Sequence, residues 1–142
     1  MLRKFSFWIW GAIITQLLTA VFHSLSFFMK PEPQNETEKQ LLDLTSNYKP
    51  DSGMGFHPSF ADLFTGLSLS FTLLCLFGAA LNWYLKKKNL AAEIWKGLLL
   101  IEALVFGALF AAMAVFTFFP PTLCTALIFI FVAGAYSTAN NK

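Results

Sequence analysis

Three consecutive lysines, Lys86 to Lys88, interrupt the longest apolar stretch of this 142-residue chain. They divide it into two runs, and each run is long enough to cross a lipid bilayer as a helix. The hydrocarbon core of a bilayer is about 30 Å thick, and at about 1.5 Å rise per residue a helix needs about 20 mostly apolar residues to span it. Four segments of the chain meet this requirement, and they are residues 5–29, 60–85, 95–119 and 122–139.

The composition agrees with a membrane protein. Hydrophobic residues make up 56% of the chain and charged residues 13%, which is about half of the charged fraction that is typical of soluble domains. Four spans leave few residues for a second domain, so we predict a single all-α domain over residues 1–142, a four-helix transmembrane bundle. The net charge of +2 is too small to suggest binding to nucleic acid. The predicted partner is therefore the lipid bilayer, with other membrane protein subunits in one of the functional classes considered below.

The distribution of Lys and Arg predicts the orientation, because short cytoplasmic loops of membrane proteins carry an excess of these residues. The segment between the first two spans contains three lysines among five acidic residues. The two ends of the chain, the segment between the second and third spans and the first residues of the third span together contain Arg3, Lys4, Lys86, Lys87, Lys88, Lys96 and Lys142. We therefore expect both termini to be cytoplasmic and residues 30–59 to form an outer loop. We also expect the first span to be retained, because its apolar run of about 25 residues is longer than that of a secretory signal.

The outer loop is predicted to contain one short helix. Pro31 and Pro33 should end the first span, because proline cannot continue a helix. Asn35 and Glu38 have the spacing of a capping box, in which each side chain satisfies backbone N–H groups at the start of a helix. The helix should run to about Tyr48 with one apolar face. Such an amphipathic helix is expected to lie on the membrane surface or to cap the bundle.

Two polar stripes run along the first and second spans at helical spacing. The second span carries Thr65, Ser68, Thr72, Cys75, Ala79 and Asn82, and the first carries Ala12, Gln16, Thr19, His23 and Ser26. Because polar faces are costly to expose to lipid, we expect the two spans to pack as a hairpin with a polar seam. Counting depth from the outer ends of the helices places His23 level with Thr65 and Gln16 level with Thr72. The seam either holds the helices together or lines a cavity or a proton path.

Ionisable residues at membrane depth are candidate functional groups. Glu102 lies about 10 Å inside the third span, with apolar neighbours on its own helix, so it should be neutral or reach the polar seam. Asp62 follows Ser59 in a pattern typical of a helix start, and it lies near the predicted level of His23. With His57 these residues could bind a divalent metal, but nothing in their spacing requires one, so we predict no metal and no cofactor. No recognisable catalytic motif is present, and no catalytic residue is assigned.

Several local patterns together resemble a known group of proteins. They are residues 35–42 and 62–71, the turn Gly53-Met54-Gly55, the pair Phe22-His23, Gly78 and Asn82. In these residues the chain resembles a family of small uncharacterised four-span bacterial integral membrane proteins. The resemblance covers most of the chain, and it implies a bacterial inner membrane and one domain. It implies no activity.

Two classes of function remain open. The first is a non-enzymatic accessory or interaction subunit of a larger membrane complex. The second is a protein that binds a lipid, a quinone-like ligand or a proton, and its candidate ligand-binding residues are Gln16, His23, Asp62, Thr65, Thr72, Asn82 and Glu102. A lipid-modifying enzyme with His23 and Asp62 as an acid/base pair would be a variant of this second class. Tight packing between the first two spans favours the first class, whereas a pocket of roughly 300 Å³ or more beside Glu102 or His23 favours the second.

Overall fold

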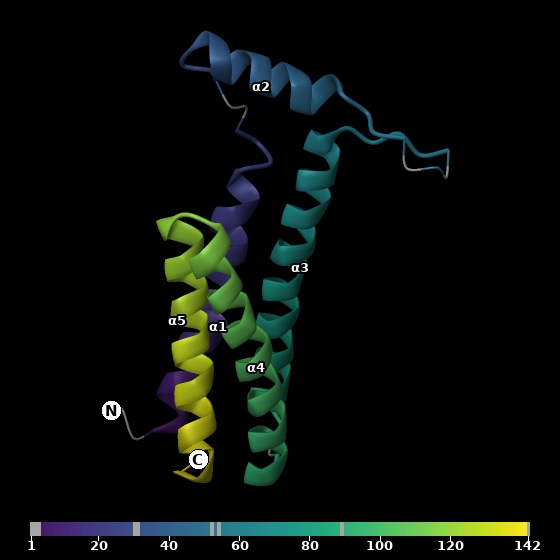
Figure 1. Ribbon diagram of the computed structural model, residues 1–142. Coiled ribbons are helices and arrows are strands. Elements are labelled where there is room, and N and C mark those ends of the chain that lie inside the picture. Colours follow the sequence, from purple (N-terminus) through teal and green to yellow (C-terminus); the bar gives the residue numbers. More distant parts are fainter. Residues whose placement is uncertain (1–3, 30–31, 52, 54, 89, 142) are drawn as a thin grey trace. The chain divides into compact units, whose positions relative to one another are not determined.

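The computed structural model describes residues 4–29, 32–51, 53, 55–88 and 90–141, and within them the chain is helical with no strands (Figure 1). The helices are α1 (Phe5–Leu25), α2 (Glu36–Asn47), α3 (Phe60–Lys86), α4 (Ala92–Phe116), α5 (Phe119–Thr138) and the short 3₁₀ helix η1 (Ala139–Asn141). Helices α1, α3, α4 and α5 are each long and apolar enough to cross a membrane. The predicted all-α class is confirmed, with four helices long and apolar enough to cross a membrane and a short helix between the first two of them. The chain is a multi-pass integral membrane protein.

Helix α1 is shorter than the predicted span 5–29. It ends at Leu25, and the backbone N–H groups of the next three residues bond to carbonyls three positions earlier, the tighter pattern with which many helices finish. The hydroxyl of Ser26 also donates to the carbonyl of His23, at 2.6 Å. Pro31, which was expected to end this helix, lies outside the described residues, as do Arg3, Lys30, Met54 and Lys142.

The connection between α4 and α5 also differs from the prediction. Helix α4 begins and ends three residues earlier than the expected span 95–119, and α5 begins at Phe119 instead of Thr122. Pro120 and Pro121 therefore lie in the first turn of α5, where a helix N–H has no partner and proline is well tolerated. The carbonyl of Met113, near the end of α4, accepts from the hydroxyls of Thr117 (2.7 Å) and Thr122 (3.1 Å).

The contacts within the chain divide it into two units. The first comprises Met1–Ala20 and Leu74–Lys142, and the second comprises Val21–Leu73. Most of α1, the later part of α3, and all of α4 and α5 belong to the first unit. The second contains α2 with the end of α1 and the beginning of α3. That residues 1–142 form one domain stays a prediction.

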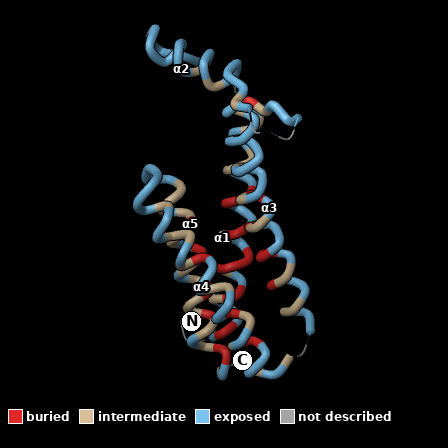
Figure 2. Tube along the Cα trace, turned by 45° about the vertical axis from the view of Figure 1, so that its right-hand side comes forward, coloured by how far each residue is buried: buried red, intermediate tan, exposed pale blue. Residues whose placement is uncertain are grey.

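The first unit has a core built on α1, α4 and α5. Helices α4 and α5 run side by side (Figure 1). The ring of Phe5 in α1 lies 5.1 Å from that of Trp95 near the start of α4, and Trp8 packs directly on Gly134 near the end of α5. Both ends of the described chain therefore lie at the same end of this unit. Most buried residues belong to this unit (Figure 2), and the largest apolar ones are Trp95, Phe106, Ile9, Leu99, Ile128 and Val132.

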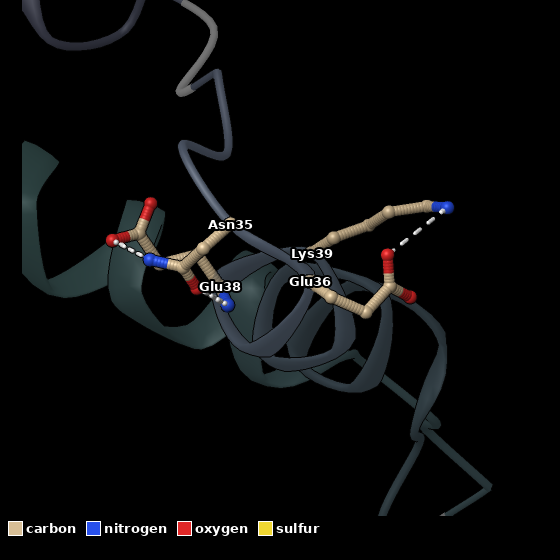
Figure 3. A network of polar contacts seen from close by, with 4 residues as sticks. All are labelled: Asn35, Glu36, Glu38 and Lys39. Atoms are coloured by element: carbon tan, nitrogen blue, oxygen red, sulfur yellow. Dashed lines mark hydrogen bonds and ion pairs between the residues drawn. The ribbon is translucent and has the colours of Figure 1, made fainter.

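The second unit contains the exposed helix α2, which has no buried residue (Figure 2). Its predicted capping box is confirmed (Figure 3). The Oδ1 atom of Asn35 accepts from the backbone N–H of Glu38 at 2.9 Å. The Glu38 carboxylate accepts from the backbone N–H of Gln34 at 2.7 Å. After α2, the ring of Tyr48 stacks on that of Phe60 at the start of α3, with 5.9 Å between centroids. The location of α2 on the membrane surface stays a prediction.

Candidate functional site

Three polar side chains from three helices of the first unit form one hydrogen-bonded cluster. The Nε2 atom of Gln16 in α1 donates to Oε1 of Glu102 in α4, at 2.9 Å. The Nδ2 atom of Asn82 in α3 lies 2.9 Å from each oxygen of Glu102 and 3.4 Å from Oε1 of Gln16. We call these three residues the amide–carboxylate cluster. Of the two alternatives considered for Glu102, the structure shows that it reaches the polar seam.

Gly78 makes room for this cluster. It lies one turn before Asn82 on the same face of α3, and it is buried. A Cβ atom at this position would lie 2.6 Å from Nε2 of Gln16 and 3.0 Å from Oε1 of Glu102. Both amide side chains are fully or almost fully buried, with 0% of Gln16 and 3% of Asn82 exposed. The absence of a side chain at Gly78 therefore allows Gln16 to cross the surface of α3 and bond to Glu102.

The depth predicted for Gln16 is wrong. Helical rise placed it level with Thr72, but its neighbours on α3 are Gly78 and Asn82, which lie about 9 to 15 Å further along that helix. The prediction assumed that α1 and α3 have their outer ends at the same level. In the structure, nine residues of α1 (17–25) follow Gln16, whereas 22 residues of α3 (60–81) precede Asn82. Helix α3 is therefore much longer on this side of the cluster.

Thr65 and Thr72 lie in the second unit and do not belong to the cluster. The hydroxyl of Thr72 is buried and donates to the carbonyl of Ser68 at 3.1 Å, and that of Thr65 is exposed and donates to Ala61 at 2.8 Å. Both bonds are made to the preceding turn of the same helix, so these hydroxyls need no partner on another helix. The polar stripe of α3 is therefore buried from Thr72 to Asn82 and exposed at Thr65. The expectation that the whole stripe turns inward is wrong.

His23 also lies in the second unit, in an aromatic environment. Its ring is edge-on to Phe71 at 5.0 Å and to Phe27 at 6.3 Å, and its imidazole is hydrogen-bonded to the backbone of Ser68. The Nε2 atom is buried and has no hydrogen-bond partner in the described part of the chain. The contacts of His23 are therefore with aromatic rings and backbone, instead of the predicted neighbours Thr65 and Asp62.

Asp62 has the role of a helix-capping residue. One of its carboxylate oxygens accepts from the backbone N–H of Ser59 at 2.9 Å and from the Ser59 hydroxyl at 2.8 Å. The same hydroxyl lies 3.2 Å from the backbone nitrogen of Asp62, from which it accepts. These reciprocal bonds satisfy backbone groups at the start of α3. The helix-start interpretation of Asp62 is confirmed, and its carboxylate is engaged away from His23.

A small pocket between α3 and α4 has the cluster on its wall. It has a volume of about 140 Å³, and Glu102 and Asn82 are its only residues with polar side chains. The other lining residues are Leu74, Phe77, Gly78, Leu81, Leu85, Leu98, Ile101, Val105 and Phe106. This volume is about half of that expected for a lipid or quinone site.

A larger groove of about 440 Å³ lies between α1 and α3 in the same unit. We call it the tryptophan groove, and it is lined by Trp10, Ile13, Leu17, Leu76, Ala79, Ala80 and Trp83. None of the predicted ligand-binding residues lies on its wall. The groove was not predicted from the sequence, although the two tryptophans lie at similar distances from the ends of their helices.

In the described ranges, no three His, Cys, Asp or Glu residues lie close enough together to hold a metal ion. Cys75 and Cys124 are both free thiols. The amide–carboxylate cluster can connect three helices, and it can present a carboxylate to the 140 Å³ pocket. Comparison with known proteins adds no further assignment: no family model, no curated protein and no solved structure matches the chain.

Proposed function

We propose that the protein is a non-enzymatic interaction subunit of a larger complex in a bacterial inner membrane. Both termini are cytoplasmic in this proposal, in agreement with the distribution of Lys and Arg. The bacterial origin follows from the resemblance to small four-span bacterial membrane proteins. What the subunit contributes is a surface on which another membrane helix packs.

The observation that carries this proposal is the exposed face of α4. This helix is the most hydrophobic of the four, and 11% of its most apolar stretch is buried within the chain. Ala108 and Ala112 lie one turn apart on it and are both exposed. Small residues at this spacing let the backbones of two membrane helices approach closely. Leu104, which is 66% exposed one turn before Ala108, adds an apolar side chain to the same face.

The amide–carboxylate cluster supports a structural role for the polar residues inside the membrane. Gln16 and Asn82 both donate to Glu102, so that α1, α3 and α4 are connected at one point. Hydrogen bonds of this kind between membrane helices contribute about 0.6 kcal/mol each on average. The cluster thus stabilises the arrangement of helices that presents the face of α4.

Site-specific photo-crosslinking tests the proposal. A photoreactive amino acid at Leu104 of α4 should give one discrete adduct with another polypeptide in native membranes. The matched control is Ile130, an apolar residue of α5 that is 51% exposed, which should give no such adduct. The double substitution Ala108→Leu and Ala112→Leu should abolish the Leu104 adduct while the protein stays folded. Equal adducts at both positions, or an adduct that survives the double substitution, would contradict the proposal.

A second function is favoured by the position of Glu102 on the wall of the 140 Å³ pocket. A carboxylate beside a small pocket in an apolar environment is suited to bind a proton, and the volume is small for a lipid or a quinone-like ligand. Proteoliposomes containing a pH-sensitive dye test this alternative. The wild-type protein should conduct protons and the Glu102→Gln variant should not. Equal fluxes through the two proteins would exclude Glu102 as a proton carrier.

A further inference from the structure

At one end of the first unit, Lys86 and Lys87 lie beside aromatic rings. The ammonium group of Lys86 lies 5.2 Å from the ring centroid of Trp10, and that of Lys87 lies 3.8 Å from the ring of Trp83. Such cation–π contacts hold an ammonium group over the aromatic face. The contact between Lys86 and Trp10 joins α3 to α1, so both lysines are oriented by the two helices that form the tryptophan groove.

The same two rings line the tryptophan groove. Trp10 and Trp83 are 42% and 49% exposed, and the other groove residues follow them toward the middle of α1 and α3. From Trp10 to Leu17, and from Trp83 back to Leu76, the lining extends over eight residues, or about 10 Å of helical rise. One leaflet of the hydrocarbon core is about 15 Å thick. The groove therefore covers about two thirds of one leaflet, with the lysines at its polar end.

Among the residues that the structure describes, no acidic side chain forms an ion pair with the lysines at this end. In the part of the chain that the structure describes, the ion pair found is Lys39 with Glu36 in α2, and neither Lys86 nor Lys87 has a carboxylate partner. Aromatic side chains such as Trp10 and Trp83 are typical of the interface between hydrocarbon and headgroups. Basic pockets between membrane helices at that level bind anionic lipid headgroups.

We infer that the tryptophan groove binds an acyl chain of an anionic glycerophospholipid, and that Lys86 and Lys87 bind its phosphate. The groove wall is apolar, as an acyl chain requires, and the two ammonium groups provide the complementary charge for the headgroup. A zwitterionic lipid would bring its own cation beside these lysines and bind more weakly. A soluble phosphate could contact the lysines, but it would leave the apolar groove empty.

Native mass spectrometry of the full-length protein in detergent tests the inference, with phosphatidylglycerol and phosphatidylcholine of identical acyl chains as probes. Phosphatidylglycerol should bind more tightly. The double variant Lys86→Gln and Lys87→Gln should bind it about 30-fold more weakly, the effect expected when two lysines near an anionic headgroup are neutralised. The matched control, Lys39→Gln with Lys49→Gln, removes the same charge from the outer loop and should change nothing. Equal binding of the two lipids, or no loss in the Lys86/Lys87 variant, would overturn the inference.

Three further measurements test the acyl chain itself. Ala80 is exposed on the groove wall, so Ala80→Phe should fill the groove and weaken binding of phosphatidylglycerol. The wild-type protein provides a test that needs no substitution, because dipalmitoyl phosphatidylglycerol should bind more tightly than the dihexanoyl lipid. Glycerol phosphate alone should not compete with the long-chain lipid. Equal affinity for both chain lengths, or full competition by glycerol phosphate, would show that the lysines bind phosphate without the groove.

Discussion

Replacing Gly78 by alanine tests whether the amide–carboxylate cluster holds the helices together. The new methyl group would lie 2.6 Å from Nε2 of Gln16, the atom that donates to Glu102, and 3.0 Å from the carboxylate oxygen that accepts. The backbone of α3 cannot move away without disturbing the whole helix. Gln16 should therefore rotate out of the way, and its hydrogen bond to Glu102 should be lost.

The expected net effect is a loss of about 1 kcal/mol of stability. Alanine in the middle of a helix is favoured over glycine by roughly 0.5 to 1 kcal/mol. Against this gain, a buried polar group that loses its partner costs about 1 to 3 kcal/mol. Because Gln16 is completely buried, we expect the second effect to dominate.

The matched control is Gly66, which lies on the same helix and where an added methyl group would meet no described atom within 4 Å. Gly66→Ala should stabilise the protein, so the two variants should differ by about 2 kcal/mol. Reversible unfolding in mixed detergent micelles, followed by circular dichroism, measures both. In a protein that already carries Gln16→Ala, the loss of stability caused by Gly78→Ala should nearly disappear. If Gly78→Ala stabilises the protein as much as Gly66→Ala does, the cluster does not hold the helices together.

Two other substitutions test separate parts of the fold. Asn35→Ala should cost about 1 kcal/mol of local helix stability and speed hydrogen exchange in α2, because α2 has no buried residue that compensates for the lost cap. The control Gln40→Ala, in the same helix, should have little effect. If hydrogen exchange in α2 is the same in the Asn35→Ala variant as in the wild-type protein, Asn35 does not stabilise the helix as its cap. Gly134→Ala should destabilise the protein by about 1 to 3 kcal/mol, because its methyl group would overlap the ring of Trp8. Gly97→Ala, whose methyl group meets no described atom, serves as the control in the same unfolding assay.

The local features of the fold could be predicted because each depends on neighbouring residues. The capping box of α2 follows from the three-residue spacing of Asn35 and Glu38, and the pair at Ser59 and Asp62 starts α3 in the same way. The predicted spans 95–119 and 122–139 leave the prolines at 120 and 121 between two helices, although the first turn of a helix accepts them equally well. Hydrophobicity alone does not show whether the prolines lie in a connecting turn or in the first turn of a helix.

The sequence by itself determined that this protein has four helices long and apolar enough to cross a membrane, because the thickness of a bilayer sets the length of apolar helix that spans it. It also determined that α1 and α3 each carry a polar face, since about 3.6 residues per turn brings Cys75, Ala79 and Asn82 onto one side of α3. Only the tertiary structure decided how far α1 is shifted along α3, and therefore that Gln16 meets Asn82 and Glu102 instead of Thr72. Periodicity describes the direction in which a side chain points around a helix axis. The shift between two helices along their axes depends on side chains that are distant in the sequence, such as Lys86 over Trp10.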